Sequence, residues 1–219
     1  MHIFDYSFLD NGLLPAGIVN LTSTISALAA LANERRNNNQ SVYTQLESIA
    51  RVQSVKNSNA IEGIITTDVR IAEIVNGNSE PLNHNEMEIA GYRDALDEIH
   101  RSYKLLPVSE ETVLHMHKVM LNNANYAHGG QYKAEDNLIM EVDSSGRRTI
   151  RFKPIPASDT KEAMEQLLLA YIDARNNANI NQLLLIPCVI LDFLCIHPFS
   201  DGNGRVSRLL TLLLLYKSE

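Results

Sequence analysis

The spacing of apolar residues constrains the fold of this 219-residue chain more than any other feature. In seven stretches the apolar positions recur every three or four residues, the spacing that puts them on one face of an α-helix. These stretches are residues 18–33, 43–61, 85–105, 110–121, 159–176, 183–196 and 205–216. The Asn-rich segments 37–39 and 176–181 are predicted loops. The sequence therefore predicts an all-α helical bundle.

One segment between the fourth and fifth helices has a different period. Apolar residues alternate with others before and after a short polar turn, a pattern typical of a β-hairpin. The alternating residues are Leu138, Met140, Val142, Ile150 and Phe152, and the turn is Asp143, Ser144, Ser145 and Gly146. For the individual residues, a surface hairpin that only covers the core and has no role in function explains the pattern equally well.

Composition excludes several classes of protein. With 45% hydrophobic residues the chain can bury a core, and its length fits one domain or two, of which we expect one. A net charge of -7 argues against binding to nucleic acid or to an anionic membrane. Residues 1–14 lack the pattern of an export signal, and the apolar run 183–196 is too short to span a membrane. We therefore expect a cytoplasmic chain with no membrane contact.

The two cysteines fit a reducing compartment. Cys188 and Cys195 lie seven residues apart on a predicted helix, so their Cα atoms are roughly 10 Å apart, beyond the reach of a disulfide. Among other polar residues, His115 and His117 fall on different helix faces and are predicted to be ordinary surface or core histidines. The charges between residues 86 and 100 are predicted to form a solvated helix face.

The stretch from His197 to Arg208 carries the residue types of a phosphate-handling site. His197 is a candidate general base, because imidazole titrates near neutral pH. The residues from Ser200 to Gly204 tolerate left-handed backbone geometry, so their N–H groups can form an anion-binding nest before a helix. Asp201 supplies a hard carboxylate of the kind that Mg²⁺ takes together with substrate phosphates.

Arg205 and Arg208 occupy positions that disfavour them. They lie one turn apart at the predicted start of the helix 205–216, where the helix dipole disfavours cations and the like-charge pair is repulsive. Local conflicts of this kind are expected at functional sites, and a bound polyphosphate would resolve this one. A glycine-rich turn followed by solvated arginines would account for the short sequence Asp-Gly-Asn-Gly alone. It does not account for all the residues from His197 to Arg208 together.

The string resembles the Fic family signature, His-Pro-Phe-x-Asp/Glu-Gly-Asn-Gly-Arg-x-x-Arg, at every defined position. The resemblance implies a Fic-type helical bundle and a protein adenylyltransferase that uses ATP and Mg²⁺. It implies that His197 deprotonates a target hydroxyl and that Asp201 holds Mg²⁺. Phe199 would pack beneath the loop, and Gly202, Asn203 and Gly204 would line the phosphate pocket. Arg205 and Arg208 would hold the β- and γ-phosphates.

Gly204 separates this chain from one subgroup of the family. Relatives that phosphorylate their targets carry Lys at this position, so Gly204 favours AMP transfer. The resemblance also implies that residues 1–76 form an N-terminal helical region and residues 77–219 a catalytic core within a single domain 1–219. Relatives usually continue past the position of Glu219, so the core is expected to be truncated there.

A second motif, Ser58 to Gly63, resembles the inhibitory pattern of the family, Ser/Thr-x-x-x-Glu-Gly/Asn. Glu62 lies near the C-terminal end of a predicted helix, where the dipole disfavours an acid, and Gly63 is placed to end that helix. An acid and an arginine that are each poorly placed can pair. By resemblance, Glu62 would bond Arg208 at the γ-phosphate position, and Ser58 belongs to the same motif.

The hairpin from Leu138 to Phe152 occupies the place of the family's flap, which binds the modified segment of a target protein by adding a strand. Gly130, Gln131, Tyr132 and Lys133 before it, and Lys153 and Pro154 after it, resemble family flanking positions. By the same resemblance, Lys153 and Pro154 are candidate nucleotide-binding residues. The target can be another protein or the chain itself.

These features predict an autoinhibited AMP transferase acting on a Ser, Thr or Tyr hydroxyl. Removal of AMP from a modified target is a second activity known in such relatives. Two alternatives stay open: a silent nucleotide-sensing module, and a Fic-like enzyme that transfers another phosphate-containing group. The sequence names no target and leaves the oligomeric state, homo-oligomers included, open.

Overall fold

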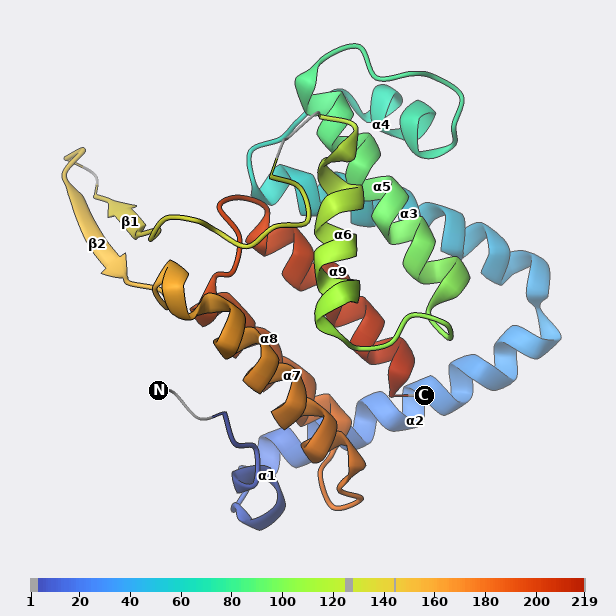
Figure 1. Cartoon of the computed structure of the whole chain (residues 1–219). Coiled ribbons are helices and arrows are strands. Elements are labelled where there is room, and N and C mark those ends of the chain that lie inside the picture. Colours follow the sequence, from blue (N-terminus) through green and yellow to red (C-terminus); the bar gives the residue numbers. More distant parts are fainter. Residues whose placement is uncertain (1–3, 125–127, 144, 219) are drawn as a thin grey trace.

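The computed structural model describes residues 4–124, 128–143 and 145–218, and it is a helical structure with one two-stranded hairpin (Figure 1). The elements are α1 (Phe8–Asn11), α2 (Ala16–Asn38), α3 (Gln40–Ile61), α4 (Asp68–Val75), α5 (His84–Ser102), α6 (Glu110–Asn122), β1 (Ile139–Val142), β2 (Arg148–Phe152), a 3₁₀ turn (Ala157–Asp159), α7 (Thr160–Asn176), α8 (Gln182–Ile196) and α9 (Asn203–Lys217). The predicted all-α fold class with a single hairpin is confirmed. Residues 1–3 and Glu219, near the ends of the chain, and Ser144 in the predicted turn lie outside the described residues.

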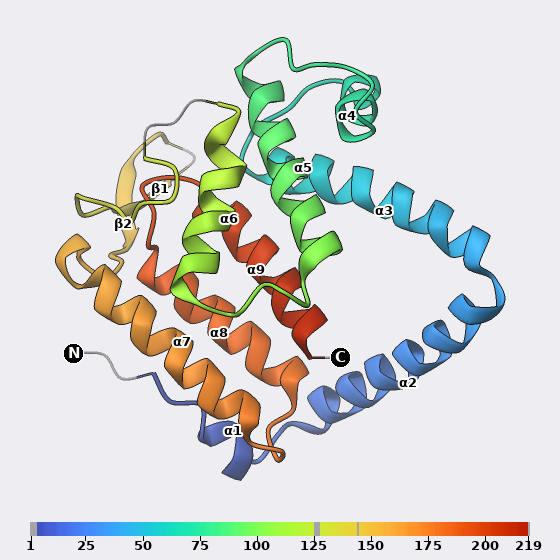
Figure 2. The ribbon, with the colours of Figure 1, turned by 45° about the vertical axis from the view of Figure 1, so that its right-hand side comes forward.

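Helix α9 lies at the centre of the helical body. It packs against α5, α6 and α8 and against the C-terminal end of α3, while α7 packs on α8 (Figures 1 and 2). Its buried apolar residues are Val206, Leu209, Leu210, Leu213 and Leu214. Since the signature string runs directly into this central helix, the core of the protein holds the candidate site in place.

A glycine allows α5 and α6 to cross closely. A methyl group on Gly91 of α5 would collide with the backbone carbonyl of Met120 on α6. The close crossing brings α6 near the loop that precedes α9, because Met120 also lies against Gly202 in that loop.

The structure differs from the prediction at one helix boundary and in one additional helix. The predicted loop at residues 37–39 is wrong: α2 continues to Asn38, and only Asn39, with φ -136° and ψ 49°, interrupts the helix. Exposed Asn costs a helix only a few tenths of a kcal/mol, so Asn37 and Asn38 do not end it. Helix α4 was not predicted, because its eight residues are too few to show a clear period.

Helices α2 and α3 form an arm that leaves the helical body and returns to it. They meet at Asn39 and enclose a wide angle (Figure 2). No residue of α2 is buried. By length and hydropathy alone, α2 is also the one helix of the described residues that could cross a membrane, with a mean hydropathy of 1.3. The sequence analysis expected no helix long and apolar enough to cross a membrane, and so overlooked α2. Its length and hydropathy also fit a helix that packs on another protein surface.

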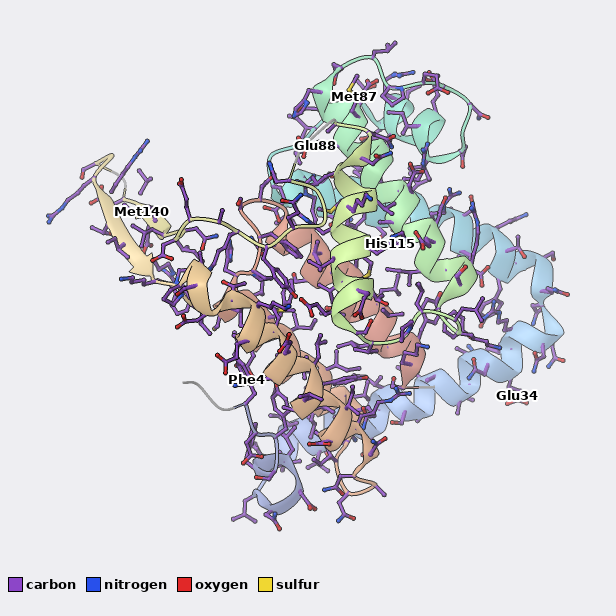
Figure 3. The ribbon with its side chains drawn as sticks, viewed as in Figure 1. Phe4, Glu34, Met87, Glu88, His115 and Met140 are labelled. Atoms are coloured by element: carbon purple, nitrogen blue, oxygen red, sulfur yellow. The ribbon has the colours of Figure 1, made fainter. Side chains whose placement is uncertain are left out.

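The hairpin projects away from the helices, and Met140 lies on this projection (Figure 3). Its strands are antiparallel, with Met140 opposite Ile150 and Val142 opposite Arg148, and the register shifts between Ile139 and Met140. At the turn, Asp143 Oδ1 accepts hydrogen bonds from the backbone N–H groups of Ser145 and Arg147 at 2.8 and 3.0 Å. The hairpin predicted from the alternation is confirmed, but no residue of either strand is buried, so the hairpin does not cover the core.

Candidate active site

His197 ends α8 and begins the loop that leads into α9. It has a left-handed backbone conformation, φ 52° and ψ 61°, and its N–H still donates to Phe193 at 3.0 Å. The imidazole is partly buried, and this burial lowers the pKa of His197 below its ordinary value, an effect opposed by the Leu194 carbonyl. The ring is therefore neutral at pH 7 and able to accept a proton.

The loop after His197 is closed by Asn203. The backbone N–H of Phe199 donates to Asn203 Oδ1 at 2.9 Å, and Asn203 Nδ2 donates to the Phe199 carbonyl at 2.7 Å. Both the oxygen and the nitrogen of the Asn203 side-chain amide are thus used to shape the loop. Gly202, at φ 79°, forms the N-cap of α9 without a side-chain hydrogen bond. The first N–H groups of α9 consequently point out of the helix, where they can bind an anion.

Arg208 links the catalytic helix to the end of α3. Its Nε donates to Ser58 Oγ at 2.7 Å, and its Nη2 donates to the Ser58 carbonyl at 2.9 Å and to Glu62 Oε1 at 2.8 Å. Gly63, at φ 77°, ends α3 as predicted. The ion pair between Glu62 and Arg208 is therefore present, and about one third of each side chain stays exposed.

The Glu62 carboxylate also lies against the start of α9. A methyl group on Gly204 would collide with Glu62 Oε1 and would crowd Arg208. Glu62 consequently fills the space above Gly204 at the N-terminus of α9, where the helix dipole favours negative charge.

Arg205 has partners that the sequence did not predict. Its guanidinium is 1% exposed, with Nη1 at 2.6 Å from Glu88 Oε2 of α5 and Nη2 at 3.3 Å from Asp201 Oδ2. Figure 3 shows Glu88 on α5. Arg205 therefore ties the loop to α5 and orients Asp201, whereas Arg208 lies at the open side of the site.

Asp201 is the carboxylate best placed to hold a metal with a substrate. It is more than half exposed. Within the described part of the chain, no cluster of three or more His, Cys, Asp or Glu side chains could hold a metal ion. A cation here would need further oxygen ligands from a substrate and from water, which is how Mg²⁺ is usually bound.

Three residues outside the signature string, His117, Lys133 and Asn137, support the loop. His117 stacks on Phe199 with ring centroids 3.8 Å apart, and its Nε2 lies 3.2 Å from the Asp201 carbonyl. The Gly130 N–H donates to His117 Nδ1 at 3.0 Å, which fixes the proton on Nε2. Burial lowers the pKa of His117 to about 4, so the ring is neutral.

Lys133 and Asn137 bind the loop from the other side. Lys133 Nζ donates to the Ile196 carbonyl at 3.1 Å and to Asn137 Oδ1 at 2.9 Å, and Asn137 Nδ2 donates to the Phe199 carbonyl at 3.0 Å. Burial lowers the pKa of Lys133. Both residues precede β1, so the segment that leads to the hairpin also holds the loop. Lys153 and Pro154, predicted as flanking residues, lie at the foot of β2, exposed and buried respectively.

The burial of Glu88 left a signal in the sequence. Glu88 shares helical spacing with Tyr92, Ala95 and Ile99, all of which are buried. An acid on an apolar face indicates a buried partner. The predicted solvated face is therefore wrong for Glu86, Glu88 and Asp97, which are 2%, 5% and 8% exposed.

Comparison with known proteins agrees with this geometry. Residues 107–215 match the model of the Fic/DOC family. Protein adenylyltransferase fic-1 of Caenorhabditis elegans is 26% identical over 113 residues, which cover 51% of this chain and 20% of that protein.

Two solved structures show the same fold. A Fic family protein from Desulfovibrio desulfuricans superposes with a TM-score of 0.74 and 22% identity, covering 94% of this chain and 59% of that one. A Fic domain containing signaling protein from Bacteroides thetaiotaomicron gives a TM-score of 0.68 and 22% identity, covering 80% and 66%. The chain thus spans less than two thirds of these proteins and about a fifth of the adenylyltransferase.

Proposed function

Because residues 107–215 place this chain in the Fic/DOC family, we propose that it is a protein adenylyltransferase held in a low-activity state by Glu62. The observation that carries the proposal is the position of Glu62. Its carboxylate pairs with Arg208 and lies against Gly204, directly beside the anion-binding start of α9. The position of Glu62 supports both the proposed activity and its proposed inhibition.

In the proposed reaction, His197 takes the proton from a Ser, Thr or Tyr hydroxyl of the target protein. The hydroxyl oxygen attacks the α-phosphorus of ATP and forms a P–O bond. The bond from the α-phosphorus to its bridging oxygen breaks, and pyrophosphate leaves with the electron pair. The neutral imidazole at the end of α8 suits this role, because burial disfavours its charged form.

The nucleotide phosphates are proposed to bind at the start of α9. The backbone N–H groups from Asn203 to Arg205 and the Arg208 guanidinium supply donors and positive charge there. Asp201, held by Arg205, would hold Mg²⁺ together with the phosphates, and the ion would neutralise charge on them. Arg205 acts on the nucleotide through Asp201, since its own guanidinium is buried against Glu88.

Glu62 competes with the end of the ATP phosphate chain. Its carboxylate already pairs with the Arg208 guanidinium and fills the space above Gly204. A phosphate in the same position would overlap with the carboxylate and be repelled by its negative charge. Productive binding of ATP thus requires Glu62 to leave. The hairpin, which projects freely beside the site, is proposed to hold the target segment as an added strand.

Labelled ATP tests the proposal directly. The wild type, the Glu62→Gly variant and the Glu62→Gly/His197→Ala variant are incubated with ATP labelled at the α-phosphate, alone and with cell lysate. Label should reach protein with Glu62→Gly and not with the double variant. Label that persists without His197 would refute its role as base. Tight ATP binding without transfer in Glu62→Gly would instead favour a nucleotide-sensing module, and intact mass identifies the group added.

A further inference from the structure

Helix α3 joins the exposed part of the arm to the candidate active site. None of the residues from 16 to 50, all of which the structure describes, is buried. The buried residues of α3 are Val55, Ser58 and Asn59, close to the end of the helix, and Glu62 follows directly. A tilt of the exposed half of α3 about this buried part would therefore move the Glu62 carboxylate (Figure 2).

Arg51 binds α3 to α5 at the place where α3 reaches the helical body. Its Nε and Nη2 donate to the two carboxylate oxygens of Asp97, both at 2.5 Å. Asp97 is 8% exposed, and Arg51 is partly buried. Two parallel hydrogen bonds between a guanidinium and a carboxylate fix the orientation of the two groups as well as their distance. The pair therefore restrains both the tilt and the rotation of α3.

This ion pair crosses a gap between α3 and α5. A cleft of about 720 Å³ lies on one side, between the arm, α5 and the end of α9, and a cleft of about 1030 Å³ lies on the other, beside the end of α4, α5 and α6. Arg51 and Asp97 line both clefts. Side-chain packing between α3 and α5 is thus interrupted on both sides of the pair, so the restraint at this level depends on the ion pair itself.

We propose that the ion pair of Arg51 with Asp97 positions Glu62 for inhibition, acting through α3; the proposal rests on the proposed inhibitory role of Glu62. Arg51, Val55 and Glu62 follow helical spacing and lie on the same face of α3, toward the body. Arg51 and Glu62 are on opposite sides of the buried Val55, about 16 Å apart along the helix. When the Arg51 end tilts away from α5, the Glu62 end moves as well.

A small movement is enough to release the inhibitory contacts. Arg208 donates to Ser58 Oγ, to the Ser58 carbonyl and to Glu62 Oε1 at 2.7 to 2.9 Å. Hydrogen bonds of this length are lost when the atoms separate by about 1 Å more. Without the pair of Arg51 and Asp97, Glu62 therefore leaves Arg208 more often, and the start of α9 is open to a nucleotide for more of the time.

Initial rates of protein labelling with ATP labelled at the α-phosphate test the proposal. Arg51→Ala should raise the rate by about tenfold, which corresponds to ~1.4 kcal/mol, a value between those of exposed and buried ion pairs. In the Glu62→Gly background the same substitution should change nothing, because no inhibitory carboxylate remains to be positioned. Arg51→Lys keeps the charge but not the two-point geometry, so its rate should lie between those of the wild type and Arg51→Ala.

Arg36→Ala is the matched control. Arg36 pairs with Glu47 at 2.7 Å inside the arm, where both side chains are more than half exposed, so its loss should leave the rate as in the wild type. The Arg51→Ala protein should stay folded, because Arg101 still lies 3.4 Å from Asp97, and circular dichroism verifies this. Hydrogen exchange followed by mass spectrometry gives a readout without ATP: amides between residues 56 and 64 should exchange about tenfold faster in Arg51→Ala and not in Arg36→Ala.

Three outcomes would overturn the proposal. One is an Arg51→Ala protein with the labelling rate and the exchange of the wild type. Another is a rate that rises equally with and without Glu62, which would mean that Arg51 acts by another route. The third is a rate that falls in both backgrounds, as a purely structural role predicts. If Glu62→Gly transfers no label at all, the proposed function fails, and the exchange of residues 56–64 alone then supports or refutes the positioning role.

Discussion

Removing the carboxylate of Glu88 should destabilise the protein strongly, although Glu88 lies outside the signature string. Glu88→Gln leaves the Arg205 guanidinium, 1% exposed, without its partner at 2.6 Å. Breaking a buried ion pair from one side costs about 3–5 kcal/mol, because an unpaired charge stays buried. Asp201, at 3.3 Å, and the Gln amide offset part of this cost, so we expect about 3 kcal/mol. For a domain of this size that lowers Tm by roughly 6–12 °C.

Thermal unfolding followed by circular dichroism measures this loss, with Glu141→Gln as the matched control. Glu141 pairs with Arg151 at 2.9 Å on the hairpin, where both side chains are more than half exposed, so its loss should cost less than about 1 kcal/mol. Replacing both members of the buried pair, Glu88→Gln/Arg205→Met, should recover part of the stability that Glu88→Gln loses. A Glu88→Gln protein as stable as the control, or strictly additive losses in the double variant, would refute the reasoning.

Other predictions concern the inhibitory pair and two histidines. Glu62→Gln keeps the side-chain volume and removes only an ion pair that is about one-third exposed and worth at most about 1 kcal/mol, so initial rates with labelled ATP should rise no more than about fivefold. Glu62→Ala also removes the side chain above Gly204, so its rate should rise further; equal rates in both variants would contradict the steric block. Because burial lowers the pKa of His197, the rate of Glu62→Ala should stay level from pH 8 to about 6.5 and fall below pH 6.5, and an inflection at or above pH 6.5 would speak against a buried neutral base. His117, with a pKa of about 4, takes up a proton only in the unfolded chain between about pH 6.5 and 4, so stability should fall by up to about 3 kcal/mol over that range; urea unfolding should show a smaller loss in His117→Gln, and an equal loss would disprove this linkage.

The local period of the sequence predicted most of the fold. Helices such as α6 and α8 and the alternating hairpin follow from side-chain spacing that needs no tertiary information. The ion pair of Glu62 with Arg208 was predicted from the resemblance to the Fic family, and the conflict of each residue with the dipole of its own helix agrees with it.

Long-range partners were beyond the reach of that reasoning. Arg205 and Arg208 look alike in the sequence, but one turns toward Glu88 on α5 and the other toward Ser58 on α3. The arrangement of helices around α9 decides which partner each arginine has, and that arrangement comes from tertiary packing. His117 is a similar case, since its role depends on Phe199, which is 82 positions away along the chain and stacks on its ring.

The left-handed backbone at His197 lowers the stability of the folded chain. Among the described residues it is the sole non-glycine residue with positive φ, a conformation that costs an L-residue about 1–2 kcal/mol. A loop that served only to reverse the chain would carry glycine here and avoid that cost. Selection for stability alone would therefore favour glycine over histidine at this position. The presence of histidine indicates that its side chain is kept for a purpose other than stability. His197→Gly should accordingly yield an inactive protein that is no less stable than the wild type, and so a cleaner inactive reference than His197→Ala.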